Sequence, residues 1–260
     1  IQSLATGHHP AAIARRLSEL TANYATLIAD ALMKLGEPRS AHAWYATATI
    51  AADDSGDSLI RAQVRAQTAM LPYYYGHLTE AVRLAREAQM LTRGRICSAA
   101  ALAAAAEARA LARLGQAAES EAALRRCQEV FDQLAEPDEE IAFRFTERRL
   151  LLYLSGTLTY LGATRRAGDV QATALLRYRD SDGIDPVLIR LDQAICLASD
   201  GKLDDGCQLA AATLNSMAPQ HRTGIVLTRT ADLIAVLPES YQHSRSVRSL
   251  KESLALPPGS

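Results

Sequence analysis

The sequence is poor in aromatic residues and has almost no runs of β-branched residues. Aromatic residues make up 5% of the 260 residues, whereas 48% are hydrophobic and alanine is abundant. Alanine has the highest helix propensity and lets helices approach closely, so this composition favours stacked helices over a β-sheet. The chain is also long enough to bury a core of its own. We therefore expect an all-α protein.

No stretch is apolar and uncharged over the length of a membrane span. The longest alanine- and leucine-rich stretch, 99–114, contains Glu107, Arg109 and Arg113, which excludes a transmembrane helix there. No secretory leader with a small-residue cleavage site begins the sequence. The first residue is Ile1 rather than methionine, so we expect a fragment or processed product. These features predict a cytoplasmic protein that does not contact membranes.

Neither sign of charge dominates the sequence. The chain has 28 basic and 29 acidic residues, for a formal net charge of −1. A domain that bound nucleic acid through its phosphates would be expected to carry a basic excess. Arginine pairs such as Arg15-Arg16 lie among acidic neighbours in a helical pattern, which is typical of solvated helix faces. We therefore do not expect this chain itself to bind DNA.

Cysteine is scarce, and its four positions are isolated. No CxxC pair occurs, and the cysteines are Cys97, Cys127, Cys196 and Cys207. Isolated cysteines in helical patterns usually act as small buried hydrophobes. Cys196 and Cys207 could face each other across one helical hairpin, but we expect reduced thiols.

Motifs that carry catalysis or bind metals are also missing. Neither a GxxxxGK[ST] nor a GxGxxG phosphate-binding loop occurs. The adjacent His8 and His9 lie in an expected flexible leader, 1–12, without further metal ligands in reach. Asp53 and Asp54 are predicted in a turn between helices, whereas a metal-dependent cyclase needs carboxylates along one helix face. We expect no catalytic residues, metal or cofactor, and a helical enzyme is the least favoured alternative.

One pattern recurs along the chain: an apolar helix that ends at glycine, a short polar turn, and a second helix. The informative offsets after the glycine are 5, 9 and 12, which are often small residues and which after Gly36 give Ala41, Tyr45 and Ala48. Glycine just past a helix can adopt the left-handed conformation, and a small residue five positions later lets the second helix cross the first closely. The glycines are separated by 40, 39, 47 and 39 residues, and they are Gly36, Gly76, Gly115, Gly162 and Gly201.

These intervals are a stretched form of the 34-residue tetratricopeptide pattern. We therefore predict a tetratricopeptide-like α-solenoid, a right-handed superhelix, with about five helix pairs and a C-terminal capping pair. The first helices are expected at 13–35, 59–75, 98–114, 141–161 and 186–199, and the second at 38–52, 78–92, 117–134, 164–178 and 203–216. A single domain would span 13–255, with a disordered tail at 256–260. The predicted repeats are 13–52, 59–92, 98–134, 141–178 and 186–216, with the cap at 219–255.

The first helix of each pair lines the concave surface of such a stack. Arginine and tyrosine recur at the positions that face this groove and would suit an acidic or amide-bearing ligand. The alternative is that the tyrosines pack between helices and the arginines pair with Glu107 or Glu147. The predicted groove residues are Gln63, Gln67, Met70, Tyr73, Tyr74, Arg109, Arg113, Arg149, Tyr153, Tyr160 and Asp192.

Several phrases resemble the C-terminal region of actinobacterial transcriptional regulators, in which a helix–turn–helix domain of the XRE type precedes tetratricopeptide repeats. They are WYATA at 44–48, YYYGH at 73–77, EARALARLG at 107–115, RLLLYLSGTLTYLG at 149–162 and HRTGIV at 221–226. The resemblance covers nearly the whole chain, which contains no helix–turn–helix domain.

This resemblance implies a non-catalytic regulatory or sensor domain. A peptide or small-molecule effector would bind in the concave groove, and DNA would be contacted only through the helix–turn–helix domain that this chain lacks. The alternative is a protein–protein interaction scaffold or a dimerisation module without a small ligand, with a homodimer as one form.

Overall fold

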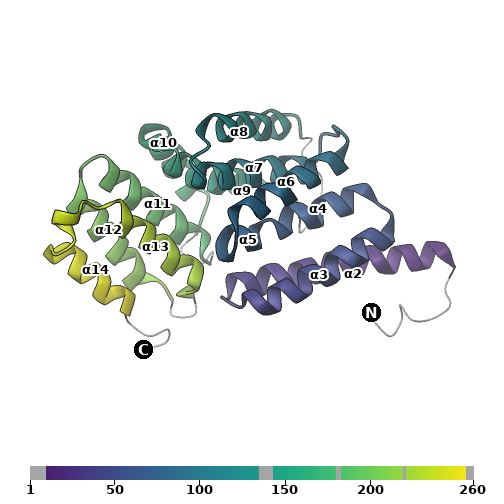
Figure 1. The fold of residues 1–260 in the computed structure, drawn as a ribbon, viewed down its shortest axis with the longest axis horizontal. Helices are drawn as coiled ribbons and strands as arrows, with labels where there is room; N and C mark the ends of the chain where they lie inside the picture. The colour runs from purple at the N-terminus through teal and green to yellow at the C-terminus, as the bar shows by residue number, and fades with distance from the viewer. Residues whose placement is uncertain (1–9, 135–142, 180–182, 219–220, 256–260) are drawn as a thin grey trace. The chain divides into compact units, whose positions relative to one another are not determined.

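The computed structural model describes residues 10–134, 143–179, 183–218 and 221–255. Every regular element in these ranges is a helix, which confirms the all-α expectation (Figure 1). The chain divides into two compact units, unit 1 up to Thr146 and unit 2 from Glu147. Residues 1–9 of the expected leader and the expected tail lie outside the described ranges. The single domain over 13–255 stays a prediction.

Unit 1 consists of helices joined by short turns. Helix α2 packs against α3, and α7 packs against both α6 and α8, as the predicted hairpins require. Helix α4 contacts α6 and α7, so neighbouring hairpins also stack on one another. The helices are α2 (Ala11–Lys34), α3 (Pro38–Ser55), α4 (Ser58–Thr68), α5 (Met70–Tyr75), α6 (Leu78–Thr92), α7 (Ser98–Arg113) and α8 (Ala117–Asp132).

Unit 2 repeats this arrangement. Helix α9 packs against α10 and α11, α11 packs against α12 and α13, and α12 packs against α14. The short η2 turn stands between the last two α-helices, where the sequence predicts the capping pair. The elements are α9 (Glu147–Tyr160), α10 (Thr164–Leu175), α11 (Asp185–Ser199), α12 (Leu203–Ser216), α13 (Gly224–Val236), η2 (Glu239–Tyr241) and α14 (Arg245–Ala255).

The residues at offset 5 after each turn glycine lie where paired helices cross. All of them are buried, as the sequence pattern predicts. At the crossing of α11 and α12 the backbones approach closely, because a Cβ on Gly206 would lie 2.7 Å from the carbonyl oxygen of Ala194. The five crossing residues are Ala41, Ala81, Ser120, Ala167 and Gly206.

Four of the five turn glycines have the expected left-handed backbone, with φ between 68° and 84°. Gly76 does not, since its φ is −147°, and the expectation is wrong at this position. Its N–H instead bonds to the carbonyl oxygen of Pro72 at 3.1 Å. A Cβ on Gly76 would lie 3.2 Å from the Cα of Pro72, so glycine is favoured there by lack of space.

The helix expected at 59–75 is broken in two at Ala69. Helix α4 ends at Thr68 and α5 begins at Met70. Pro72 lies inside the second piece and has no N–H to donate to the carbonyl oxygen of Thr68, so the regular helical hydrogen bonding is interrupted here. The break therefore follows from Pro72, which the helix prediction for 59–75 did not take into account.

Three other helix boundaries differ from prediction by three residues or more, and one of them is the end of α10, at Leu175 rather than near 178. Helix α9 begins at Glu147 rather than near 141, because Phe145 is buried against Phe131 of α8, with ring centroids 6.2 Å apart. Asp53 and Asp54 lie in the last turn of α3 rather than in a loop, since the helix continues to Ser55. The left-handed Gly56, with φ 68°, ends it.

Replacing Gly206 by alanine tests the close crossing in unit 2. We expect Gly206→Ala to lower the free energy of unfolding by about 1–3 kcal/mol, because the added methyl group overlaps the Ala194 carbonyl oxygen. Gly168→Ala in α10 is the control, since a Cβ there meets no atom within 4 Å and alanine gains up to about 1 kcal/mol of helix propensity. Denaturant unfolding measures both, and equal effects would contradict the close crossing.

Candidate ligand-binding site

The predicted groove residues divide between the two units. Arg149, Tyr153, Tyr160 and Asp192 belong to unit 2, and the others belong to unit 1. In unit 1, the Gln63 side chain donates to Asn23 Oδ1 at 3.1 Å, and Gln67 donates to Asp30 Oδ1 at 2.6 Å. Both bonds join α4 to α2, so these glutamines hold neighbouring hairpins together. Met70 is buried in the core.

Two tyrosines of α5 and two arginines of α7 form one cluster. The guanidinium carbon of Arg109 lies 4.6 Å from the ring centroid of Tyr73, and its Nη1 donates to the Tyr74 hydroxyl at 3.1 Å. Arg113 lies 5.1 Å from the same Tyr73 centroid and donates to the Tyr73 carbonyl oxygen at 2.7 Å. Each contact is a favourable cation–π or hydrogen-bond interaction. The sequence correctly grouped these residues, and the structure shows them bound to one another.

The alternative, in which the groove arginines pair with Glu107 or Glu147, is wrong, and Glu147 pairs with Arg177 at 3.1 Å. Glu107 is buried and ion-paired, but its partners are Arg86 at 2.7 Å and Arg126 at 2.8 Å, from the adjacent second helices. Burial by itself raises the pKa of Glu107, but hydrogen bonds from Gln89 and the arginines outweigh it and leave this pKa below its usual value. Glu107 thus stays charged and links α7 to α6 and α8.

Unit 2 contains a buried ionic network around Asp192. Its carboxylate accepts hydrogen bonds from Arg229 Nε at 2.6 Å and from Ser155 Oγ at 2.6 Å, and Arg229 Nη2 also contacts it. Tyr160 donates to Asp232 at 2.6 Å, and its ring centroid lies 4.0 Å from the Arg229 guanidinium carbon. The network joins α9, α11 and α13. Tyr153 is buried and Arg149 is half-buried.

Sequence reasoning missed Arg229, because it lies in the predicted cap rather than in a predicted repeat. The spacing between residues of the first helices could have identified Arg229. Ser155, Asp192 and Arg229 are separated by 37 residues each, which is close to the repeat interval, and they lie in three successive first helices. The groove prediction therefore identified residues that contact one another, and their polar groups are used in joining helices.

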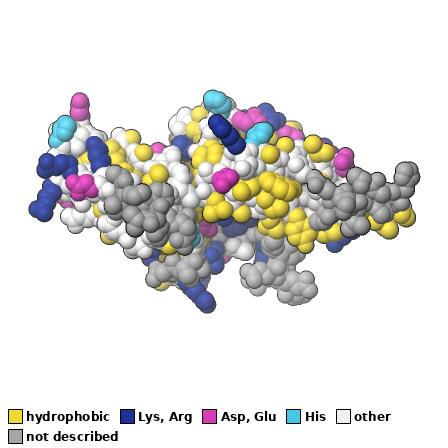
Figure 2. All heavy atoms as spheres, turned by 90° about the horizontal axis from the view of Figure 1, so that it is seen from below, with side chains coloured by type: hydrophobic (Ala, Val, Ile, Leu, Met, Phe, Trp, Pro, Cys, Tyr) yellow, Lys and Arg dark blue, Asp and Glu magenta, His cyan; other side chains and the backbone are white. Residues whose placement is uncertain are grey.

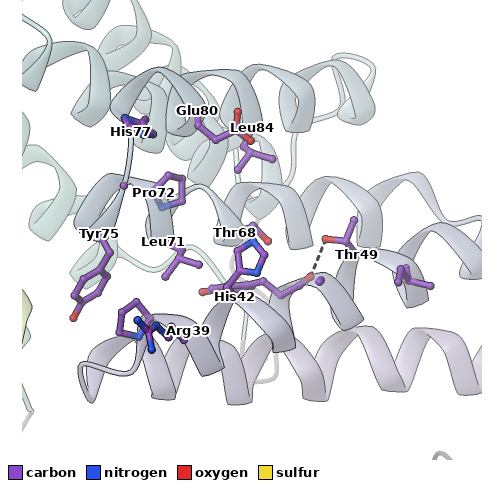
Figure 3. A pocket seen from close by; sticks show the side chains of 15 residues that line it. Arg39, His42, Thr49, Thr68, Leu71, Pro72, Tyr75, His77, Glu80 and Leu84 are labelled. Atoms are coloured by element: carbon purple, nitrogen blue, oxygen red, sulfur yellow. Dashed lines mark hydrogen bonds between the residues drawn. The ribbon is translucent and has the colours of Figure 1, made fainter.

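A cavity of about 820 Å³ that is open to solvent lies elsewhere in unit 1, between α3, α5 and α6. Arg39, His42 and His77 in its lining are exposed. Figure 3 shows Arg39 and His42 on α3, Leu71, Pro72 and Tyr75 on the opposite wall, and His77, Glu80 and Leu84 along α6. A volume of this size is typical of sites for small organic ligands. The lining residues are Pro38, Arg39, His42, Tyr45, Ala46, Thr49, Ile50, Thr68, Leu71, Pro72, Tyr75, Gly76, His77, Glu80 and Leu84. We call it the α3–α5–α6 cavity.

The helix break at Ala69 lies beside this cavity, whose wall includes Pro72 and Gly76. The predicted groove used only inward positions of first helices, so it did not include the second helices α3 and α6 that form two walls. Pro72 inside a helical pattern was the available signal, because proline there predicts a kink and a local departure from regular packing.

The polar groups of the cavity are of two kinds. Thr49, Thr68 and Tyr75 donate their hydroxyl protons to backbone carbonyl oxygens at 2.9, 2.7 and 3.1 Å, and both carboxylate oxygens of Glu80 bind Arg83 at 2.7 Å. The hydrogen bonds from Arg83 hold the pKa of Glu80 below its usual range. In contrast, three cavity side chains make no hydrogen bond or ion pair with any described residue: Arg39, His42 and His77.

Other chemistry is limited in the described ranges. They contain no group of three or more histidine, cysteine or acidic side chains that could hold a metal ion. Nor do they contain a helix long and apolar enough to cross a membrane. The four cysteines are free thiols, and burial raises the pKa of Cys127 to about 12.

Comparison with protein-family models and with curated proteins finds no match for this chain.

The Asp192–Arg229 pair allows a test of whether the unit 2 cluster serves stability. We expect Arg229→Met to lower the free energy of unfolding by about 3–5 kcal/mol, because it leaves the Asp192 carboxylate buried without its cation. Asp192→Leu should cost less, since Arg229 keeps its ion pair with Asp232 at 3.3 Å. The double variant should lose far less than the sum. Denaturant unfolding provides the measurement.

The matched control is Arg16→Ala in the exposed Arg16–Glu19 pair, where the atoms lie 2.7 Å apart. Its loss should stay below about 1 kcal/mol, since exposed ion pairs contribute little. If the single changes in the buried pair cost no more than this control, the network does not stabilise unit 2.

Proposed function

We propose that this chain is a non-catalytic, ligand-binding regulatory domain built from tetratricopeptide-like repeats. The observation that carries the proposal is the α3–α5–α6 cavity, which is apolar and of ligand size. Three of its side chains, Arg39, His42 and His77, make no hydrogen bond or ion pair with a described residue. Support for the repeat architecture comes from the pairing of polar residues 35–40 positions apart between neighbouring first helices. Such pairs arise when equivalent positions stack repeat on repeat.

The regulatory role rests on the resemblance to helix–turn–helix regulators with C-terminal repeats. In that role the domain would act in the cytoplasm, and DNA would be contacted by a separate helix–turn–helix domain. An effector in the α3–α5–α6 cavity would favour one packing of the first hairpin, α2–α3, on α5 and α6 over another. A ligand shifts such an equilibrium only through its different affinities for the two packings.

A neutral apolar probe tests the cavity as a ligand site. We expect N-phenyl-1-naphthylamine to bind the chain with a rise in fluorescence, and Ala46→Trp to weaken binding at least about tenfold by filling the cavity. Ala43→Trp is the matched control, because Ala43 is exposed on the same helix and does not line the cavity. Equal affinity of both variants would place the probe elsewhere, and absence of binding to the unaltered chain would contradict the proposed function.

A second candidate function, self-association, is favoured by the surface of α2. Tyr24, Leu27 and Ile28 are 53%, 39% and 38% exposed, although the opposite side of the helix is buried. Figure 2 shows apolar side chains gathered over the surface of α2 and α3. An apolar face of this kind on a helix often marks a protein interface.

The spacing on α2 matches a second copy of the chain as partner. Apolar residues alternate at intervals of four and three, as in a coiled coil, at Ile13, Leu17, Leu20, Tyr24, Leu27 and Ala31. The series is symmetric about residue 22, so two antiparallel copies would pair each residue with an apolar partner. The same alignment brings Arg16 of one copy towards Asp30 of the other, and their charges are complementary.

Sedimentation velocity tests the self-association. We expect a dimer for the unaltered chain and a monomer with unchanged melting temperature for Leu27→Glu, because a charge in the apolar face opposes pairing. Met90→Glu is the control, since Met90 is 72% exposed in the same unit but lies on α6. A monomer at every concentration of the unaltered chain would rule out this second function.

A further inference from the structure

The α3–α5–α6 cavity differs in character from one end to the other. Arg39 lies in the first turn of α3, and His77 is the N-terminal capping residue of α6. Both residues lie towards the same end of the view in Figure 3, whereas Thr49 and Leu84 lie towards the other end. One end of the cavity is therefore basic and the other is mostly apolar.

The two helices add to the positive character of the basic end. Helices α3 and α6 both begin there, with 18 and 15 residues respectively. A helix of this length carries a partial positive charge at its N-terminus, where its first N–H groups have no partner within the helix. The one acidic group in the lining, Glu80, is already bound by Arg83 through both oxygens. Glu37, the N-terminal capping residue of α3, lies outside the lining and accepts a hydrogen bond from Ser40 at 3.0 Å.

Given the proposed function, on which this inference rests, we propose that the cavity binds a small apolar molecule that carries one carboxylate. Arg39, in the first turn of α3, forms the ion pair with the carboxylate. The apolar body lies along the wall made by Ala46, Leu71 and Leu84. Charge complementarity selects this class, because Arg39 is exposed at the end of an apolar cavity, makes no ion pair with a described residue and can pair with an anion.

A peptide fits the cavity less well than a small acid. Backbone recognition of an extended peptide needs a series of donors and acceptors along the groove. Here the hydroxyl protons of Thr49 and Thr68 are used within their own helices, at 2.9 and 2.7 Å, and Glu80 is held by Arg83. Only Arg39 and His77 lie at the basic end, whereas His42 lies further along the cavity (Figure 3). This arrangement suits a ligand with a single charged group.

A pair of probes that differ only in charge tests this inference with the full chain. Calorimetry would compare 6-(1-naphthyl)hexanoate with its primary amide, which has the same shape without the charge. We expect the carboxylate to bind at least about tenfold more tightly than the amide. Arg39→Gln should bring the ratio close to one, mainly by weakening the carboxylate.

Arg125→Gln is the matched control, because Arg125 is exposed in the same unit and lies outside the cavity. This variant should keep the full preference for the carboxylate, and circular dichroism would verify that both variants are folded. Equal affinity for the two probes, or a preference that persists in Arg39→Gln, overturns the inference while leaving the cavity as a ligand site. If the chain binds neither these probes nor the neutral naphthylamine, the proposed function fails as well.

Discussion

Close contact between the backbones of paired helices is the constraint on which both units depend. The second helix of each pair presents alanine, serine or glycine at the crossing, and these residues are buried. Ser120 shows how near the backbones come, since its hydroxyl donates to the carbonyl oxygen of Ala108 at 2.8 Å. A larger side chain would separate the pair and displace every contact that follows. The abundance of alanine is therefore needed for close crossings of paired helices as well as for helix formation.

Regular stacking then determines which polar groups meet. Neighbouring first helices bring together residues one repeat apart, such as Gln63 with Asn23, and Asp192 with Arg229. Buried polar and charged groups are costly unless they are paired, so these positions accept only complementary partners. Residues of the types found in binding sites can thus have a packing role. The cluster of Tyr73 with Arg109 illustrates it, because its ring and guanidinium face one another.

The α3–α5–α6 cavity lies where the regular pattern is interrupted. Pro72 cannot complete the backbone hydrogen bonds of a continuous helix, and the chain breaks at Ala69. The same segment contains Gly76, the one turn glycine without a left-handed backbone. A departure from the repeat and a ligand-sized volume therefore occur together. In a structure whose crossings are tightly packed, such a departure is a natural place for a ligand.

The sequence by itself determined the all-α class, most helix boundaries and the buried crossing residues, because these follow from local propensity and from a spacing that repeats. It also grouped Tyr73, Tyr74, Arg109 and Arg113. Tertiary structure alone decided that these side chains bind one another, and that Arg229 completes the network of Asp192. It also decided that Arg39, His42 and His77 share a cavity. The physical reason is that periodicity specifies which face of a helix a residue occupies, whereas its partner depends on how separate helices pack.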